Sequence, residues 1–524
     1  MASSEKTTVD LSAAMITEPA ALADWLVIAP LAWCIVLGAL LLMVRKDTRL
    51  QPYIAIPGLA ALVLLDAALL AHVVVNGPVT MTMGRWLPPF GISFTVDILG
   101  ALLCLTAGIA AFAGGIYGAG DVNHSGRRYG FYPFLFLMMA GVSGAFLTGD
   151  IFNLYVWFEV LLIASFGLLI LGSERGQIDG ATKYAFLNLV ATTLFLIATG
   201  YLYGIFGTLN MADIALKAPA MRDKAPMITL VSLYLLAFGM KAAAFPVNFW
   251  LPASYHTPRV VVSALFAGLL TKVGVYALMR VTLVLFPAER DVLGFIIAII
   301  AAATMIIGAM GALAQTDFRR LLGYLVISGI GVMFAGLALA SPGGVSGTIF
   351  YAVHSMIVMT ALYLATGLAA RAAGGFSIAS ASGIYSSHLF LAAITLVLFF
   401  AVSGLPPFSG FWPKVILVKA SLDVGAWWLA GVILVTGFLT TIAVGRVWVL
   451  SYWRPSAGTA VADDEEAVVL NPMVDYLPLL LLTALVVIIG IFPQQILELS
   501  QTGSEQMLNP VDYIRSVFPQ GDQQ

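Results

Sequence analysis

The chain is short of charged residues and of cysteine, and each shortage excludes classes of protein. Asp, Glu, Lys and Arg make up 10% of its 524 residues, where an average soluble domain has about 25%. The net charge of −2 gives no basic excess that would favour binding to nucleic acid. Two cysteines, Cys34 and Cys104, are too few for a disulfide framework or an iron–sulfur site. With 60% hydrophobic residues, the composition indicates an integral membrane protein surrounded by the lipid bilayer.

Catalytic and cofactor motifs are missing as well. The sequence has no phosphate-binding loop, no dinucleotide fingerprint after a strand, no metal-ligand spacing and no Ser/His/Asp set beyond chance. We therefore expect no cofactor, no bound metal and no enzyme active site. Residues 1–24 lack the basic region and cleavage site of a secretory signal, so residues 25–44 are expected to form a retained first span.

Long apolar runs, by contrast, are abundant. A helix needs about 20 residues to cross the hydrocarbon core. This length predicts an all-α polytopic membrane protein with about 14 transmembrane helices. The predicted spans are 25–44, 53–75, 94–118, 131–148, 150–172, 183–206, 228–251, 260–286, 292–314, 321–340, 346–370, 389–421, 425–452 and 474–495.

Prolines interrupt the seventh and the twelfth of these spans. The seventh contains Ala244–Pro246, and the twelfth, too long for one straight crossing, contains Leu405–Gly410. A proline inside a helix removes a backbone hydrogen bond and kinks or breaks the helix. Broken helices in corresponding positions of two halves are typical of a transport pathway. We therefore predict two inverted five-helix repeats, formed by spans 4–8 and 9–13.

These repeats define the expected organisation of the chain. Residues 1–130 would hold helices 1–3, residues 131–286 the first repeat and residues 292–452 the second. Residues 453–524 would hold a loop, helix 14 and the C-terminal tail.

Loop charges indicate the orientation. Cytoplasmic loops carry an excess of Lys and Arg. With both termini outside, the cytoplasmic loops hold most of the basic loop residues: Arg45, Lys46, Arg49, Arg127, Arg128, Arg175, Arg259, Arg319, Arg320, Arg371 and Arg454. Both termini are therefore predicted on the outer side.

Four charged residues lie near the middle of apolar spans: Glu159, Lys241, Lys272 and Lys414. A charge at the centre of a spanning helix costs roughly 2.5–3.5 kcal/mol on insertion scales. A chain with so few charges is expected to use the ones that it places there. An ion or proton pathway is the leading hypothesis.

Glu159 and Lys241 are the natural partners in this set. Desolvation weakens the binding of a proton to a buried lysine, and a nearby carboxylate strengthens it. Movement of Glu159 towards or away from Lys241 would therefore make the lysine take up or release a proton. The alternatives are that Glu159 is a structural carboxylate and that Lys241 extends to an interface. Lys272 is too far from either end of its span to extend to an interface. Lys419 is expected at the membrane boundary.

Histidines and aspartates add weaker candidates. His354, in the eleventh span, is either a packing residue or a proton relay, for which its ordinary pKa of about 6.5 is suited. His256 follows the first broken helix and is a candidate proton exit. Asp66 and Asp97 also lie in or near spans, but we rank them below the others.

Several motifs resemble one membrane-protein superfamily. They are Gly149–Leu154 (GDIFNL), Trp157–Leu162 (WFEVLL), Lys241 before Ala244–Pro246, Trp250–Pro252, Leu270–Tyr276 (LTKVGVY), Gln315–Tyr324 (QTDFRRLLGY) and Ser403–Phe411 (SGLPPFSGF). Together they resemble the antiporter-type subunits of Mrp cation/proton antiporters. The superfamily also supplies proton-pumping membrane subunits of respiratory complex I and of membrane-bound hydrogenases. The resemblance covers nearly the whole chain and is closest to the MrpD branch, also named MnhD or PhaD.

The resemblance implies roles for five residues. Glu159 and Lys241 would be the helix 5 and helix 7 pair, Lys272 the central helix 8 lysine, His354 the helix 11 histidine and Lys414 the helix 12 group. Lys414 favours the antiporter branch, because the related complex I subunit often has glutamate there. The family pattern after the histidine often has a second histidine and a lysine. Ser355 and Met359 stand there in this chain, so water would have to bridge the relay from His354 to Lys414.

The resemblance also implies an activity, partners and a location. We expect a subunit of an inner-membrane hetero-oligomer in which inward proton flow drives Na⁺ or K⁺ out, a secondary transporter and not an enzyme. One alternative is a proton-pumping subunit of an NADH-quinone oxidoreductase or a hydrogenase-type complex. A second alternative is a scaffold whose lysines are locked in ion pairs.

Overall fold

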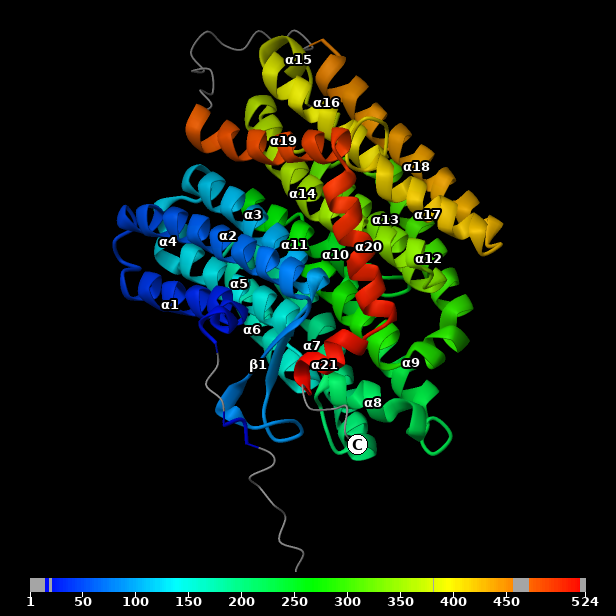
Figure 1. The fold of residues 1–524 in the computed structure, drawn as a ribbon. Helices are drawn as coiled ribbons and strands as arrows, with labels where there is room; N and C mark the ends of the chain where they lie inside the picture. The colour runs from blue at the N-terminus through cyan, green and yellow to red at the C-terminus, as the bar shows by residue number, and fades with distance from the viewer. Residues whose placement is uncertain (1–14, 18–20, 380, 456–470, 519–524) are drawn as a thin grey trace, which may run out of the picture.

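The structure is a computed structural model that describes residues 15–17, 21–379, 381–455 and 471–518 (Figure 1). It is a helical membrane bundle, and its only sheet among these residues is a two-stranded hairpin. Most of the predicted loop 453–472 and both chain ends lie outside the described residues.

Helices α1 to α11 occupy the first half of the chain. Their bounds are α1 (Ala29–Met43), α2 (Leu50–Asn76), α3 (Ile98–Asp121), α4 (His124–Tyr129), α5 (Phe131–Leu147), α6 (Ile151–Leu169), α7 (Arg175–Phe206), α8 (Met211–Met221), α9 (Met227–Ala242), α10 (Trp250–Ser254) and α11 (Val260–Met279).

Helices α12 to α21 follow in the second half. Their bounds are α12 (Pro287–Ala314), α13 (Phe318–Leu339), α14 (Pro342–Ala373), α15 (Ile384–Ser387), α16 (Leu389–Ser403), α17 (Phe411–Asp423), α18 (Trp427–Val447), α19 (Leu477–Ile491), α20 (Gln494–Leu508) and α21 (Val511–Val517). Short 3₁₀ segments are η2 (Leu22–Val27) and η3 (Met83–Arg85), and π-helical segments are η4 (Arg280–Leu285), η5 (Trp448–Trp453) and η6 (Pro472–Tyr476).

The helices show the apolar lengths that the sequence predicts. Among the described residues, ten helical segments are long and apolar enough to cross a membrane, and α1, α5, α9 and α16 are shorter apolar helices. Each of the predicted spans overlaps one of these helices. The protein is therefore a multi-pass membrane protein, and the number of 14 crossings stays a prediction.

Short polar side chains begin many of the helices. Asp97, Asp150, Asn210, Asp317 and Ser341 each occupy the N-cap position and accept a hydrogen bond from a backbone N–H of the first turn. An N-cap of this type satisfies a donor that has no partner within the helix. These caps set where α3, α6, α8, α13 and α14 start, and hence the depth of every side chain that follows.

Two helices form the centre of the molecule. The apolar windows of α11 and α14 are buried along their whole length, and the two helices pack against each other and against α3. In Figure 1, α1 and α2 (blue) lie on one side of this centre, and α16 to α18 (yellow to orange) lie on the other. Functional groups on α11 and α14 are thus shielded from lipid.

The two breaks that the prolines predict are present and share one geometry. The first lies between α9 and α10, and the second between α16 and α17. Ala243 and Gly404, the first residues after α9 and α16, both adopt positive φ. Three backbone hydrogen bonds close each break. In the first break they run from Ala243 to Met240, from Ala244 to Gly239 and from Val247 to Ala244. In the second break they run from Gly404 to Ala401, from Leu405 to Phe400 and from Phe408 to Leu405. The same spacing recurs in both.

The remaining elements close one end of the bundle. Strands β1 (Val79–Thr82) and β2 (Ser93–Val96) pair antiparallel, with Val79 opposite Val96 and Thr82 opposite Ser93. Helix α20 packs on α3 and α14, and α21 packs on α8 and the hairpin. Figure 1 shows both helices (red) running across the face of the bundle towards the hairpin end.

Candidate functional site

Lys241 lies on the last turn of α9, with only 5% of its surface exposed. Its ammonium donates a 2.9 Å hydrogen bond to the hydroxyl of Thr192 on α7 and lies 4.7 Å from the centroid of the Phe158 ring. Glu159 is the next residue on α6, and its Oε1 atom is buried without a hydrogen-bond partner. Among the described residues, Glu159 and Lys241 form no ion pair. The lysine therefore lies beside the carboxylate's helix but is held by a neutral hydroxyl.

Lys272 lies in the middle of α11 and is 1% exposed. Its Nζ donates a 2.6 Å hydrogen bond to the backbone carbonyl of Ala267, one turn earlier on the same helix. The neighbouring hydroxyl of Thr271 is buried without a partner. Lys272 therefore has a neutral acceptor and, in the part of the chain described, no carboxylate within ion-pair distance.

His354 lies on α14 and points at the second break. Its Nδ1 shares a 2.8 Å hydrogen bond with the hydroxyl of Ser409, while its Nε2 is buried without a partner. A Cβ atom at Gly410 would lie 2.9 Å from Nε2, so the absence of a side chain there permits the close approach. The imidazole retains one nitrogen available for proton exchange.

Lys414 lies on the first turn of α17 and reaches back across the second break. Its Nζ donates to the carbonyl oxygens of Val402, at 3.2 Å, and Ser403, at 2.7 Å, at the end of α16. In the first break a neutral side chain caps a nearby carbonyl, because the indole of Trp250 donates a 3.0 Å hydrogen bond to the carbonyl of Met240, which also accepts from the backbone N–H of Ala243. The second break thus has a titratable cap and the first has a neutral one.

The five predicted residues lie on a continuous series of packed helices. Helix α6, which carries Glu159, packs on α7, and α7 packs on α9; α9 then packs on α11, α11 on α14, and α14 on α17. Within the described residues, no hydrogen bond or ion pair links two of the five directly. The series runs from the first break to the second through the buried centre of the bundle.

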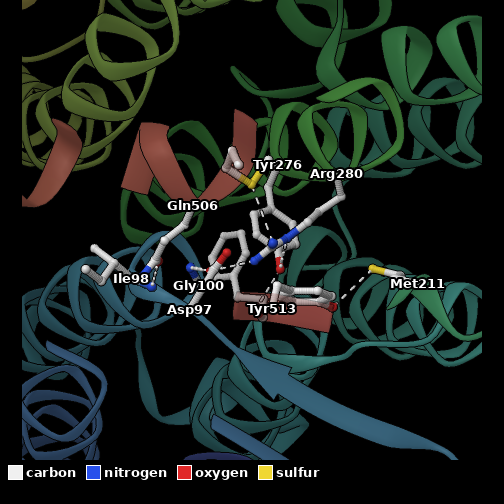
Figure 2. A network of polar contacts seen from close by, with 10 residues as sticks. Asp97, Ile98, Gly100, Met211, Tyr276, Arg280, Gln506 and Tyr513 are labelled. Carbon is white, nitrogen blue, oxygen red and sulfur yellow. Dashed lines mark hydrogen bonds and ion pairs between the residues drawn. The ribbon is translucent and has the colours of Figure 1, made fainter. Parts of the chain in front are cut away.

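Sequence reasoning missed one strongly charged cluster, shown in Figure 2. Arg280, at the end of α11, is 1% exposed and forms a 2.5 Å ion pair with the equally buried Asp97 at the start of α3. Its guanidinium also donates a 3.0 Å hydrogen bond to the hydroxyl of Tyr276 and lies 5.3 Å from the ring centroid of Tyr513 on α21. Gln506 on α20 accepts a hydrogen bond from the backbone N–H of Ile98. An arginine inside the apolar run 260–286 was the signal that could have revealed it.

The weaker candidates divide into three kinds. Asp66 on α2 is fully buried, and neither of its carboxyl oxygens has a partner. Lys419 forms an exposed ion pair with Asp423, as expected of a boundary residue. His256 lies in the loop after α10, where its Nδ1 bonds the carbonyl of Pro252 and its Nε2 accepts from Arg320. Burial, and then the charge of Arg320, lower the pKa of His256 below its ordinary value.

A cavity of about 420 Å³ opens beside this loop. Its lining includes Asp121 and Glu174 together with three arginines, Arg259, Arg319 and Arg371. These residues come from the ends of α3, α11, α13 and α14 and from the turn before α7. The cavity places charged groups at one end of the two central helices.

Comparison with known proteins decides the family. The profile of the NADH:quinone oxidoreductase/Mrp antiporter transmembrane family matches residues 148–440, more than half of the chain. The chain belongs to this family. The matched segment begins just before α6 and ends within α18, so it contains both breaks and all five candidate residues.

Two curated relatives match along almost the whole sequence. The D-type subunit of the Na⁺/H⁺ antiporter of Alkalihalophilus pseudofirmus is 35% identical over 94% of this chain and 99% of its own length. The protein of the same name from Bacillus subtilis is 32% identical over the same shares.

Solved structures agree with the fold. A chain of the Mrp complex from a Dietzia species is 27% identical, with a TM-score of 0.88, covering 95% of this chain and 100% of that one. A chain of respiratory complex I from Thermus thermophilus, 24% identical, matches with a TM-score of 0.77 over 92% of this chain and all of its own. That second likeness concerns the fold alone.

Proposed function

We propose that this chain is the D-type component of a multisubunit monovalent cation/proton antiporter. Inward proton flow through it would drive Na⁺ or K⁺ out of the cell, as a secondary transporter without enzyme chemistry of its own. The observation that carries the proposal is a series of buried ionisable groups on packed helices. Within the residues that the structure describes, the lysines in this series donate hydrogen bonds only to neutral oxygen atoms. The names of the relatives that match along the full chain point to the same activity.

The proton path would run along Glu159, Lys241, Lys272, His354 and Lys414. Each lysine is held by a hydroxyl or a carbonyl oxygen, so it can release a proton without breaking a hydrogen-bonded ion pair. Buried titratable groups in a membrane that face the protein interior typically mark proton relays. No direct hydrogen bonds join the five in the described residues, so water or side-chain movement would complete each step.

The proposed organisation follows the two breaks. Their shared backbone geometry supports two inverted repeats, residues 131–286 and 292–452, within 14 transmembrane helices. Residues 1–130 and 453–524 would flank them. Both termini would face the outer side of the inner membrane, which places the 420 Å³ cavity at the cytoplasmic end of α11 and α14.

The partners would be the other subunits of an Mrp-type complex, and the cargo protons and Na⁺ or K⁺. The second, less favoured candidate is a proton-pumping subunit of a redox complex, because the matching family also includes NADH:quinone oxidoreductase subunits. Purification from native membranes separates the two. Small antiporter subunits would accompany an antiporter, whereas quinone- or iron–sulfur-binding subunits would accompany a pump.

Transport in everted membrane vesicles tests the path. Glu159→Ala and Lys241→Ala should each lower cation-dependent pH recovery by about 100-fold, the usual contribution of a group that transfers a proton. Lys419→Ala, which removes an exposed lysine, is the matched control and should transport normally. Normal recovery in the first two variants, with the complex assembled, would favour a scaffold and defeat the relay.

A further inference from the structure

A small polar cavity lies beside Lys414 in the second break. Its volume is about 10 Å³, and its lining includes Ser328 on α13, Tyr351 on α14 and Thr436 and Thr440 on α18. A cavity of about 10–15 Å³ holds one particle of the size of a water molecule. The cavity is therefore suited to a single small occupant surrounded by oxygen atoms.

The oxygen atoms here are of the kind that hold alkali cations. Hydroxyl groups come from the lining, and the carbonyls of Val402 and Ser403 lie at the frayed end of α16, within hydrogen-bond distance of the Lys414 ammonium. The C-terminal carbonyls of broken helices coordinate Na⁺ in other transport folds, because these oxygens lack partners within the helix. At present the lysine satisfies them with its own positive charge.

We propose that this cavity is a binding site for one monovalent cation, Na⁺ or K⁺, which competes with the proton of Lys414 for the carbonyls of Val402 and Ser403. The inference rests on the proposed function and adds a location for the cation. When the ammonium is protonated, like-charge repulsion excludes a cation from the adjacent cavity. When the amine is neutral, its lone pair and the released carbonyls become ligands.

This exchange keeps the charge of the site constant. The ammonium releases one proton, one cation enters, and the positive charge in the break is the same before and after. The titratable groups facing the site are Tyr351, in the cavity lining, and His354, both on α14. The lining residues from α13, α16 and α18 are neutral. His354, bonded to Ser409 in the same break, is positioned to take up the released proton and pass it on, and the charge of the break is restored to its starting value once that proton has left the imidazole.

The first break does not offer the same site. There the carbonyl of Met240 accepts from the backbone N–H of Ala243 and from the indole of Trp250, and neither donor releases a proton near neutral pH. Lys241 is directed to Thr192 on a different helix. The two breaks therefore share a backbone geometry but differ in the groups that surround a bound cation. This difference assigns cation exchange to the second break.

Gly437 gives a direct test in the assembled complex. A Cβ atom there would lie 3.8 Å from Nζ of Lys414 and 3.9 Å from the carbonyl of Ser403, so Gly437→Ala occupies space at the site without a clash. Gly431→Ala, on the same helix with no atom within 4 Å of its Cβ, is the matched control. Gly437→Ala should raise the KM for Na⁺ or K⁺ by about tenfold, and Gly431→Ala should not.

Thermal stability supplies a second measurement that does not depend on transport. NaCl or KCl should raise the Tm of the purified wild-type complex relative to choline chloride, and less so at low pH, where protons compete. Gly437→Ala and Thr436→Val should reduce this increase. Unchanged KM values and unchanged stabilisation in both variants would show that the cavity holds water only. That result would overturn the inference while leaving the relay intact, because loss of transport in Lys241→Ala tests the relay separately.

Discussion

Two regions of this bundle bury positive charge in opposite ways. At the end of α11, Arg280 is paired with Asp97 and makes further contacts with two tyrosines and with the sulfur of Met507 (Figure 2). Eight residues earlier on the same helix, Lys272 has a single hydrogen bond to a backbone carbonyl. One helix thus carries a fully compensated charge and an almost uncompensated one.

The difference separates a structural charge from a transferable one. Arginine keeps its proton at any physiological pH, so a buried guanidinium needs a permanent counter-ion. A buried lysine with neutral acceptors can lose its proton and remain satisfied as an amine. Lys241, Lys272 and Lys414 all have neutral acceptors, which is the arrangement that a relay requires and a permanent ion pair prevents.

The largest expected effect on stability is at the ion pair between Arg280 and Asp97. Arg280→Ala leaves Asp97 buried without its counter-ion, which should cost about 3–5 kcal/mol of the free energy of unfolding. The Tm of the purified complex and the yield of folded protein measure this loss. Arg280→Met with Asp97→Asn, which removes both charges and keeps an N-cap, should recover much of it. A Tm for Arg280→Ala equal to that of wild type would contradict the assignment.

Lys272→Ala should have the opposite effect, a small change in stability and a large loss of transport. The variant loses one hydrogen bond within α11, worth about 1 kcal/mol, and also the cost of burying a charge, so the Tm should move little. Proton transport by the reconstituted complex should fall about 100-fold, because the centre of the relay is gone. Loss of folding with this variant, or transport at the wild-type rate, would remove the distinction between the charge in the middle of α11 and the charge at its end.

The helix caps in the two breaks sharpen the comparison further. Trp250→Phe removes one of two donors to the carbonyl of Met240, which still accepts from the backbone N–H of Ala243, so stability should fall by only about 1 kcal/mol while transport continues. Lys414→Met leaves the carbonyls of Val402 and Ser403 without a donor and also removes a relay group, so both stability and transport should fall. Melting curves and vesicle assays on the two variants make the comparison. Equal transport in both would mean that Lys414 acts only as a cap.

The sequence predicts the parts of this structure that depend on local pattern. Apolar length locates the helices, and the prolines locate both breaks. The lysines could be placed in the membrane interior because each lies near the middle of a long apolar run. The motif resemblance indicated the family, and the profile match and full-length relatives confirmed it.

What the sequence does not predict depends on contacts between distant segments. Asp97 and Arg280 are 183 positions apart, and only the packing of α3 on α11 brings them together. The pairing of Lys241 with Glu159 stays a prediction, and the sequence did not predict that the hydroxyl of Thr192 on α7 accepts a hydrogen bond from the Lys241 ammonium. The cavity beside Lys414 takes its oxygens from several helices, so no motif in a single segment announces it.

Asp150 provides the smallest and most controlled test, because it lies between the two classes of buried charge. It caps α6 by accepting the backbone N–H of Asn153, immediately before the span Ile151–Leu169 of the structure, and burial raises its pKa from 3.8 to about 6. A carboxyl with a higher pKa in the folded state binds more protons there, so its stabilising effect is complete below pH 3.8 and is lost as the pH rises through about 6. Asp150→Asn keeps the cap but does not titrate. The Tm of wild type should therefore fall more steeply than that of Asp150→Asn over this pH range, whereas parallel curves would mean that the carboxylate is already compensated, as Asp97 is.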